Sequence, residues 1–99
     1  MSRLYATRQS QCDIESIVDV YKQDSSGGKR ILKRIDQLLD LIEANPNVGE
    51  AREDLSSGLR VISANPYVSS FRSRGENVEL LGVLHGSRDW EGLFREGYR

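Results

Sequence analysis

Several cationic side chains fall at or near the ends of the strands that we expect in the C-terminal half of the chain. They are Arg60, Arg72, Arg74, His85 and Arg88. Strand ends that face the same way can bring several cations onto a single phosphate or carboxylate. The spacing therefore allows an anion-binding cluster in this half of the chain.

His85 is the only histidine, and it closes an apolar segment in the sequence Leu84-His85-Gly86-Ser87-Arg88-Asp89. A lone histidine at this place is either a hydrogen-bonded structural residue or an acid–base group. Gly86 permits a tight exit from the strand, and Arg88 and Asp89 are close enough in sequence to pair. No serine is singled out as a nucleophile beside His85, so no Ser/His/Asp set is indicated.

Two other segments suggest chemistry only superficially. Ser25-Ser26-Gly27-Gly28-Lys29-Arg30 lacks the spacing of a phosphate-binding loop, so we expect no nucleotide site. The basic residues Lys29, Arg30, Lys33 and Arg34 form either a solvated helix face or a contact for nucleic acid or an acidic partner.

Cys12, expected to be half-buried near a helix start, has no second cysteine for a disulfide or metal site, and we expect no metal and no cofactor.

Composition indicates a small cytoplasmic protein. The 99 residues suffice for one domain, residues 1–99, with one modest core. The net charge of −1 gives no overall attraction to nucleic acid or an anionic membrane, and residues 35–56 hold six acidic residues against one basic residue. A single cysteine fits a reducing compartment, and no apolar run approaches the length of a signal peptide core or a membrane span.

The N-terminal half reads as a short strand followed by two helices. A strand is expected over 4–7, and Ser10 with Asp13 matches a capping box that would start a helix reaching about Gln23. Residues 24–28 are turn-like, and a second helix is expected over 29–44, ended by Asn45-Pro46. The apolar stripes of the two helices have helical spacing and consist of Ile14, Ile17, Val18 and Tyr21, and of Ile31, Leu32, Ile35, Leu38, Leu39 and Ile42.

The C-terminal half reads as strands. Residues 47–58 are expected to form a loop, followed by strands over 59–63, 67–72 and 78–84 that are joined by short turns. Such links imply an antiparallel meander, and the apolar segment 78–84 is the best interior strand. Trp90, Leu93 and Phe94 suggest a short terminal helix or a docking tail. The predicted fold is α+β with the order β-α-α-β-β-β, in which a helical hairpin packs on a mostly antiparallel sheet whose first strand lies beside the last.

Five segments, in order, are similar to motifs of one known family. Residues 13–17 match the acidic-apolar opening of its first helix, and 45–49 match the Pro and Gly after its second. Residues 52–60 match R-x-D-L-x-x-G-L-R, Pro66-Tyr67 with Phe71-Arg72 match G-x-Y and F-Y-R, and 83–89 match V-L-H-G-A-R-D. Over almost its whole length the chain resembles the ParE branch of the RelE/ParE toxins of type II toxin-antitoxin systems.

This resemblance implies a toxin that arrests growth, contributes to plasmid stabilisation and is neutralised by a ParD-like or similar antitoxin encoded with it. The C-terminal segment of the antitoxin would wrap the hairpin and the sheet. We therefore expect antitoxin contacts along the helical stripes, at Ile14, Ile17, Val18, Tyr21, Ile31, Ile35, Leu38 and Ile42.

Within the family, ParE-like members act on DNA gyrase, and RelE-like members cut messenger RNA on the ribosome. The positions that carry the RelE-like ribonuclease residues correspond to Val68, Arg88 and Phe94, of which only Arg88 keeps suitable chemistry. We therefore favour a gyrase inhibitor that acts by protein binding rather than as an enzyme, with target contacts at Arg60, Arg88, Trp90 and Phe94. The alternatives are a ribosome-dependent endoribonuclease using Arg88, Arg72, Tyr67 and His85, and a degenerate, non-toxic module that only binds antitoxin.

Overall fold

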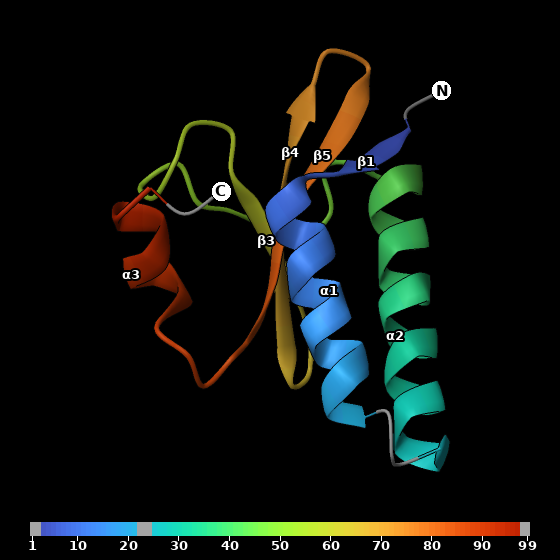
Figure 1. Cartoon of the computed structure of the whole chain (residues 1–99). Coiled ribbons are helices and arrows are strands. Elements are labelled where there is room, and N and C mark those ends of the chain that lie inside the picture. Colours follow the sequence, from blue (N-terminus) through green and yellow to red (C-terminus); the bar gives the residue numbers. More distant parts are fainter. Residues whose placement is uncertain (1–2, 22–24, 98–99) are drawn as a thin grey trace.

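The computed structural model describes residues 3–21 and 25–97 and shows helices on both sides of a sheet (Figure 1). The elements in chain order are β1 (Leu4–Ala6), α1 (Arg8–Tyr21), α2 (Ser25–Ala44), β2 (Glu50–Ala51), β3 (Arg60–Ala64), β4 (Tyr67–Arg74), β5 (Asn77–His85) and α3 (Trp90–Arg95). The predicted α+β class and element order are confirmed. β2 is an addition that forms inside the expected loop, and α3 is the short terminal helix that was one of the two alternatives expected for the tail.

The five strands are ordered β1-β5-β4-β3-β2. β1 runs parallel to β5, with Leu4 opposite Val78, and the other pairs are antiparallel. This arrangement confirms the expected pairing of the first strand with the last and the interior position of β5. A short β1 can be parallel to β5 because the helical hairpin provides the long crossover that parallel strands require.

The start of α1 differs from the expected capping box. The helix begins at Arg8, and Thr7 is its capping residue, because the Thr7 Oγ1 accepts from the Ser10 backbone N–H at 3.2 Å. Ser10 lies inside the first turn, fully buried, with its Oγ donating to the Thr7 carbonyl at 2.8 Å. Asp13 Oδ2 instead accepts from the Val83 N–H at 3.0 Å, so it joins α1 to β5.

The start of α2 is also earlier than expected. Gly27 and Gly28, which were predicted to lie in a turn, belong to the first turns of α2, which begins at Ser25. A Cβ on Gly28 would lie 2.8 Å from the Tyr21 carbonyl oxygen and 3.2 Å from the Tyr21 Cβ. The glycine therefore permits close approach of the two helices. The expected end of α1 at Gln23 lies outside the described residues.

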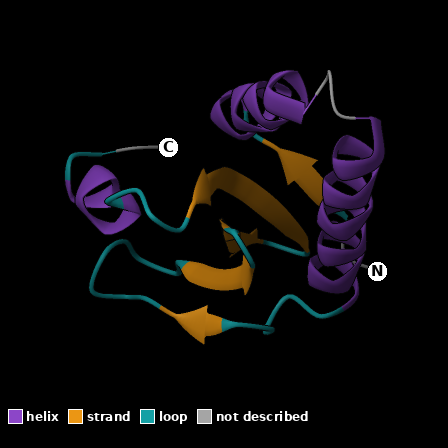
Figure 2. Ribbon diagram, turned by 90° about the horizontal axis from the view of Figure 1, so that it is seen from below, coloured by secondary structure: helices purple, strands orange, loops and turns teal. Residues whose placement is uncertain are grey.

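The sheet separates two cores, and Figure 2 shows the helical hairpin and α3 apart from one another around it. Under α1 and α2, the core residues are Ile17, Ile35, Leu38, Ile42, Tyr67, Phe71, Val78, Leu80 and Val83. The smaller core lies between the other face of the sheet, the 52–59 segment and α3, and consists of Leu55, Leu59, Val61, Leu81 and Phe94. Burial on both faces explains why β5 is apolar almost throughout.

Candidate functional site

A pocket of about 310 Å³ lies between α1 and the adjoining ends of β4 and β5. Its α1 wall has helical spacing, because it is made by positions 13, 16, 17 and 20. The complete lining is Asp13, Ser16, Ile17, Val20, Tyr67, Val83, Leu84, His85 and Arg88. The pocket therefore places three of the polar residues expected from the sequence, Tyr67, His85 and Arg88, around one space.

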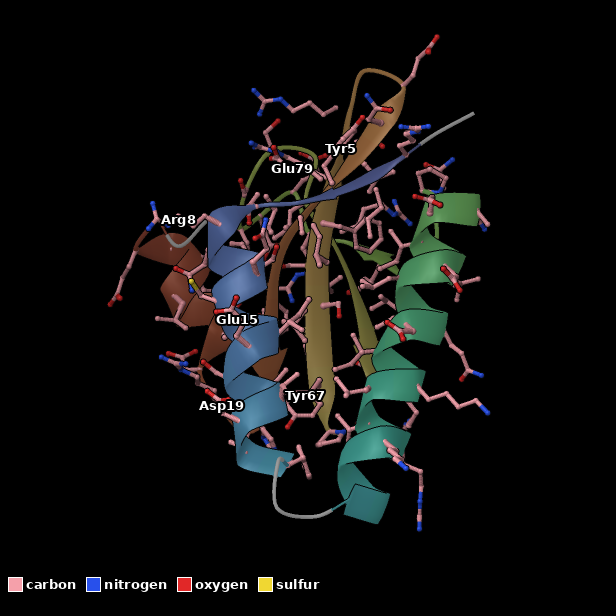
Figure 3. The ribbon with its side chains drawn as sticks, turned by 45° about the vertical axis from the view of Figure 1, so that its right-hand side comes forward. Tyr5, Arg8, Glu15, Asp19, Tyr67 and Glu79 are labelled. Carbon is pink, nitrogen blue, oxygen red and sulfur yellow. The ribbon has the colours of Figure 1, made fainter. Side chains whose placement is uncertain are left out.

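Tyr67 and His85 are cross-strand neighbours in this pocket. They pair in the β4–β5 register, and their rings meet edge to face with centroids 5.5 Å apart. Tyr67 is 7% exposed, and its burial, together with a hydrogen bond to Tyr21, raises the pKa of its hydroxyl to about 12. Figure 3 shows Tyr67 at the end of the sheet near the helical hairpin. At neutral pH this phenol stays protonated, so it is not a general base.

The His85 ring is held by its own loop. Its Nδ1 accepts from the Ser87 backbone N–H at 3.1 Å and lies 2.7 Å from the Ser87 Oγ. An accepting Nδ1 places the proton of the neutral imidazole on Nε2. This geometry agrees with the structural alternative for His85 and leaves Nε2 as the donor of the ring.

Arg72, the fourth candidate for ribonuclease chemistry, does not join this group. It pairs with Glu79, with an Nε–Oε1 distance of 3.3 Å and an Nη2–Oε1 distance of 3.2 Å. Five residues separate Arg72 from Tyr67, which is roughly 17 Å along a strand. Its neighbour Phe71 faces the core under α1 and α2, so Arg72 faces the opposite side of the sheet. The predicted four-residue set is therefore not assembled.

Two of the four predicted target contacts have structural roles instead. The Arg60 guanidinium donates to three backbone carbonyls, those of Asn47 at 2.6 Å, Val48 at 3.1 Å and Gly49 at 3.0 Å, and so holds the segment before β2 against β3. Phe94 is 6% exposed and belongs to the smaller core. Phe94 therefore has little accessible surface, because α3 folds back onto the sheet, whereas Arg60 is of intermediate exposure. A target contact at either residue stays a prediction.

The other two predicted target contacts remain accessible. Arg88 is exposed in the loop before α3. Trp90 is partly buried, and its ring lies 6.5 Å from that of Phe94 in an edge-to-face arrangement. Asp89, which was expected to be near enough to pair with Arg88, caps α3 by accepting from the Gly92 N–H at 3.0 Å.

Arg52 belongs to the segment that matches R-x-D-L and was not predicted to have a site role, yet it connects several groups in this part of the molecule. Its guanidinium donates to Asp54 through Nε at 3.0 Å and Nη2 at 2.9 Å, and to Glu91 Oε2 at 2.5 Å. Its Cζ lies 5.5 Å from the centroid of the Trp90 ring. The hydrogen bonds from Arg52 hold the pKa of Asp54 below its usual value. Arg52 therefore connects the 52–59 segment to α3.

The predicted antitoxin stripe needs correction for half of its members. Ile17, Ile35, Leu38 and Ile42 are buried against the sheet, with Ile42 at 0% exposure. Three others, Ile14, Tyr21 and Ile31, are partly buried against the same core, and Val18 is of intermediate exposure. These stripes build the hairpin–sheet interface, because a 99-residue chain must use its best apolar faces for its own core.

The exposed apolar side chains of the hairpin are different ones. Val20 is 74% exposed, Leu41 45% and Leu32 36%. Leu32 belongs to the apolar stripe predicted for the second helix, whereas helical periodicity did not single out Val20 and Leu41, because they lie at the borders of the buried stripes.

The described residues hold no group of three His, Cys, Asp or Glu side chains arranged to bind a metal ion. Cys12 is exposed rather than half-buried as expected. No helix within residues 3–21 and 25–97 is long and apolar enough to cross a membrane.

Comparisons with known proteins identify the family. Residues 4–90 match the family described as the ParE toxin of type II toxin-antitoxin system, parDE. Toxin ParE3 of Caulobacter vibrioides is 32% identical over 88 residues, which cover 87% of this chain and 88% of that toxin. Toxin ParE1 of Mycobacterium tuberculosis is 28% identical over 92 residues, covering 89% and 93% respectively.

The fold has a counterpart among solved structures. A chain of the chromosomal ParDE TA system from P. aeruginosa superposes with a TM-score of 0.71 at 21% identity, over 86% of this chain and 96% of that one. This likeness shows a shared RelE/ParE fold, and the sequence matches show the family. The chain belongs to the ParE toxin family of type II toxin-antitoxin systems.

Proposed function

We propose that this toxin inhibits DNA gyrase by binding it and that a cognate antitoxin, ParD-like or similar, neutralises the toxin in the cytoplasm. Family membership supports the assignment as a toxin. The observation that carries the choice of a binding mechanism is the incomplete chemistry of the pocket, where Arg72 is absent and Tyr67 holds its proton.

RNA cleavage by a 2′-hydroxyl needs a base for that proton, a cation for the phosphorane oxygens and an acid for the leaving oxygen. Within the pocket, Arg88 can supply the cation and His85 Nε2 can exchange one proton. Tyr67, with its raised pKa, is a poor second acid–base group at neutral pH. The convergence of Tyr67, His85 and Arg88 nevertheless makes ribosome-dependent RNA cleavage the second candidate function.

The antitoxin surface that we propose follows the exposed apolar residues of the hairpin rather than the buried stripes. Val20, Leu32 and Leu41 offer apolar area that an amphipathic partner helix would remove from water. Because such a partner binds the folded toxin, its binding should raise the melting temperature of the toxin. The substitutions Val20→Ser and Leu41→Ser should weaken the complex with little loss of toxin stability.

For the gyrase contact, we propose Arg88 and the accessible part of Trp90, which are two positions apart where the loop after β5 leads into α3. Arginine and tryptophan are the residues that dominate binding hot spots. Arg52 would act indirectly, by holding α3 and Trp90 in place.

Induction of the toxin in growing bacteria, with and without the neighbouring antitoxin gene, tests this function. A gyrase inhibitor should cause DNA-damage signalling and filamentous cells before protein synthesis falls, and the antitoxin should restore growth. An early stop of translation with message cleavage would favour the ribonuclease, and antitoxin binding without growth arrest would indicate the non-toxic module. Arg88→Ala should reduce toxicity, whereas Arg74→Ala, a change at an exposed arginine in the β4–β5 hairpin, should not.

A further inference from the structure

We propose that the pocket between α1 and the ends of β4 and β5 binds a carboxylate that is attached to a branched apolar group. The ligand class is the free carboxylate of an apolar residue, either at the end of a polypeptide or in a small acyl amino acid. Binding of such ligands to the isolated toxin is independent of gyrase, so the site and the gyrase function can fail separately.

The polar groups offered by the pocket are mainly donors. Arg88 is exposed at the rim and takes part in none of the ion pairs found among the described side chains. His85 Nδ1 already accepts from Ser87, so Nε2 is the donor of the neutral ring. A guanidinium and an imidazole N–H in the lining of one pocket suit an anionic oxygen ligand, because the guanidinium fork can donate two parallel hydrogen bonds to a carboxylate.

Both carboxylate oxygens of Asp13, the acidic residue of the pocket lining, accept hydrogen bonds from the chain itself. Asp13 Oδ2 accepts from the Val83 backbone N–H at 3.0 Å, and Asp13 Oδ1 accepts from the Gln9 Nε2 at 3.0 Å. Asp13 therefore shapes the wall but offers little to a cationic or hydroxyl-rich ligand. Asp13 is also an acidic residue of the lining, and repulsion from its charge grows with the negative charge of the ligand. This favours a carboxylate, with one negative charge, over a phosphate, which carries up to two.

The remaining lining is apolar and small. Ile17 and Val83 are buried at 6% and 2% exposure, Leu84 is 6% exposed, and Val20 forms an open apolar rim at 74% exposure. A volume of about 310 Å³ is at the lower end of ligand pockets, which run from roughly 300 to 1,000 Å³. Such a space fits one branched side chain whose carboxylate reaches Arg88.

Titration of the isotope-labelled full-length toxin, followed by NMR, tests the site. The probes are N-acetyl-leucine, the tripeptide acetyl-Ala-Ala-Leu with a free carboxylate, its C-terminal amide, and inorganic phosphate. We expect saturable shifts of the Val20, Val83 and His85 signals with the two carboxylates, with dissociation constants on the order of millimolar for such small ligands. The amide and phosphate should bind at least about tenfold more weakly, because each lacks one of the two recognised features.

Variants then assign the contacts. Arg88→Gln should weaken N-acetyl-leucine binding by about tenfold or more, and Val20→Ser should weaken it less. Both positions are exposed, so these variants should keep the wild-type fold, and Arg74→Gln is the matched control that should bind as wild type. Tighter binding of the tripeptide than of N-acetyl-leucine would identify a polypeptide terminus as the source, and equal binding would identify a small acid. Phosphate binding as strong as carboxylate binding, equal binding of the amide, or no saturable shift would overturn the proposal.

Discussion

Arg52 and Glu91 are separated by 39 positions in the sequence, yet the Arg52 Nη2 donates to the Glu91 Oε2 at 2.5 Å. The same guanidinium binds Asp54 through two nitrogen atoms and lies over the Trp90 ring. One side chain thus joins the segment that leads into β3 to the helix that ends the described chain. It is a polar connection of α3 to the rest of the molecule, beside the apolar contact of Phe94.

We predict that Arg52→Met loosens α3 without unfolding the toxin. Methionine keeps apolar contact with Trp90 but cannot donate to Asp54 or Glu91. Elements with fewer contacts open locally while the core remains folded. Hydrogen exchange should therefore become faster for the α3 amides and stay unchanged in β4 and β5. Arg74→Met is the control, and equal protection of α3 in Arg52→Met and wild type would show that Phe94 alone docks the helix.

We predict that Thr7→Ala destabilises the toxin by about 1 kcal/mol, the usual cost of losing a side chain that caps a helix. Thr7 Oγ1 satisfies the Ser10 N–H at the start of α1. Ser16→Ala is the comparison, because the Ser16 Oγ donates to the Cys12 carbonyl within the same helix, a bond that contributes little to stability. Urea unfolding of both variants measures the difference. A larger loss for Ser16→Ala would contradict the assignment of the cap.

We predict that alanine substitutions of Ser69 and Ser70, which are adjacent in β4, change the free energy of unfolding in opposite directions. Both are buried, but the Ser69 Oγ has no hydrogen-bond partner among the described residues, whereas the Ser70 Oγ donates to the Gly82 carbonyl at 3.3 Å. An unsatisfied buried hydroxyl costs about 1–3 kcal/mol. Ser69→Ala should therefore raise the free energy of unfolding by up to that amount, and Ser70→Ala should lower it. Destabilisation by Ser69→Ala would indicate that a water molecule satisfies the hydroxyl.

We predict that the toxin loses stability at alkaline pH because of Tyr67. Its pKa is raised to about 12 in the folded toxin, whereas a tyrosine in an unfolded chain has a pKa near 10. Above about pH 10 the unfolded chain releases this proton while the folded toxin retains it, so the contribution to stability is complete below pH 10 and is lost as the pH rises to 12.

Urea unfolding between pH 8 and about pH 11.5 checks this behaviour. Tyr67→Phe should show a flatter decline of the unfolding free energy with pH than wild type. Tyr5→Phe, at a position that is 54% exposed, should keep the wild-type slope. If Tyr67→Phe and wild type decline in parallel, the phenol is less buried than the structure shows.

Much of the fold follows from the sequence by simple rules. Short turns joined the three C-terminal strands into a meander, and the apolar β5 was correctly assigned to the interior. The errors concern which surfaces meet. Thr7 replaces Ser10 as the cap because both have hydroxyl side chains that can cap a helix, and the path of the chain from β1 decides between them.

The site was harder to predict than the fold, for the same reason. Helical periodicity identifies an apolar stripe but not the surface that covers it. Ile42 was therefore assigned to the antitoxin contact, although it is buried in the core of the toxin itself. Strand-end arginines look equivalent in sequence, yet Arg60 binds backbone carbonyls and Arg72 binds Glu79, while Arg88 remains exposed. The grouping of Tyr67 with His85 depends on the β4–β5 register, which their sequence separation alone does not reveal.

The most direct test of gyrase inhibition by this toxin is incubation of purified toxin with DNA gyrase, ATP and supercoiled plasmid. A parallel reaction contains the toxin and translating ribosomes. We predict that the toxin traps linear DNA with gyrase covalently attached, that the antitoxin prevents this, and that ribosome-bound message stays intact. Arg88→Ala should reduce trapping, and Arg74→Ala should not. If micromolar toxin leaves gyrase fully active while message on the ribosome is cut, the toxin is a ribonuclease and the proposed mechanism is wrong.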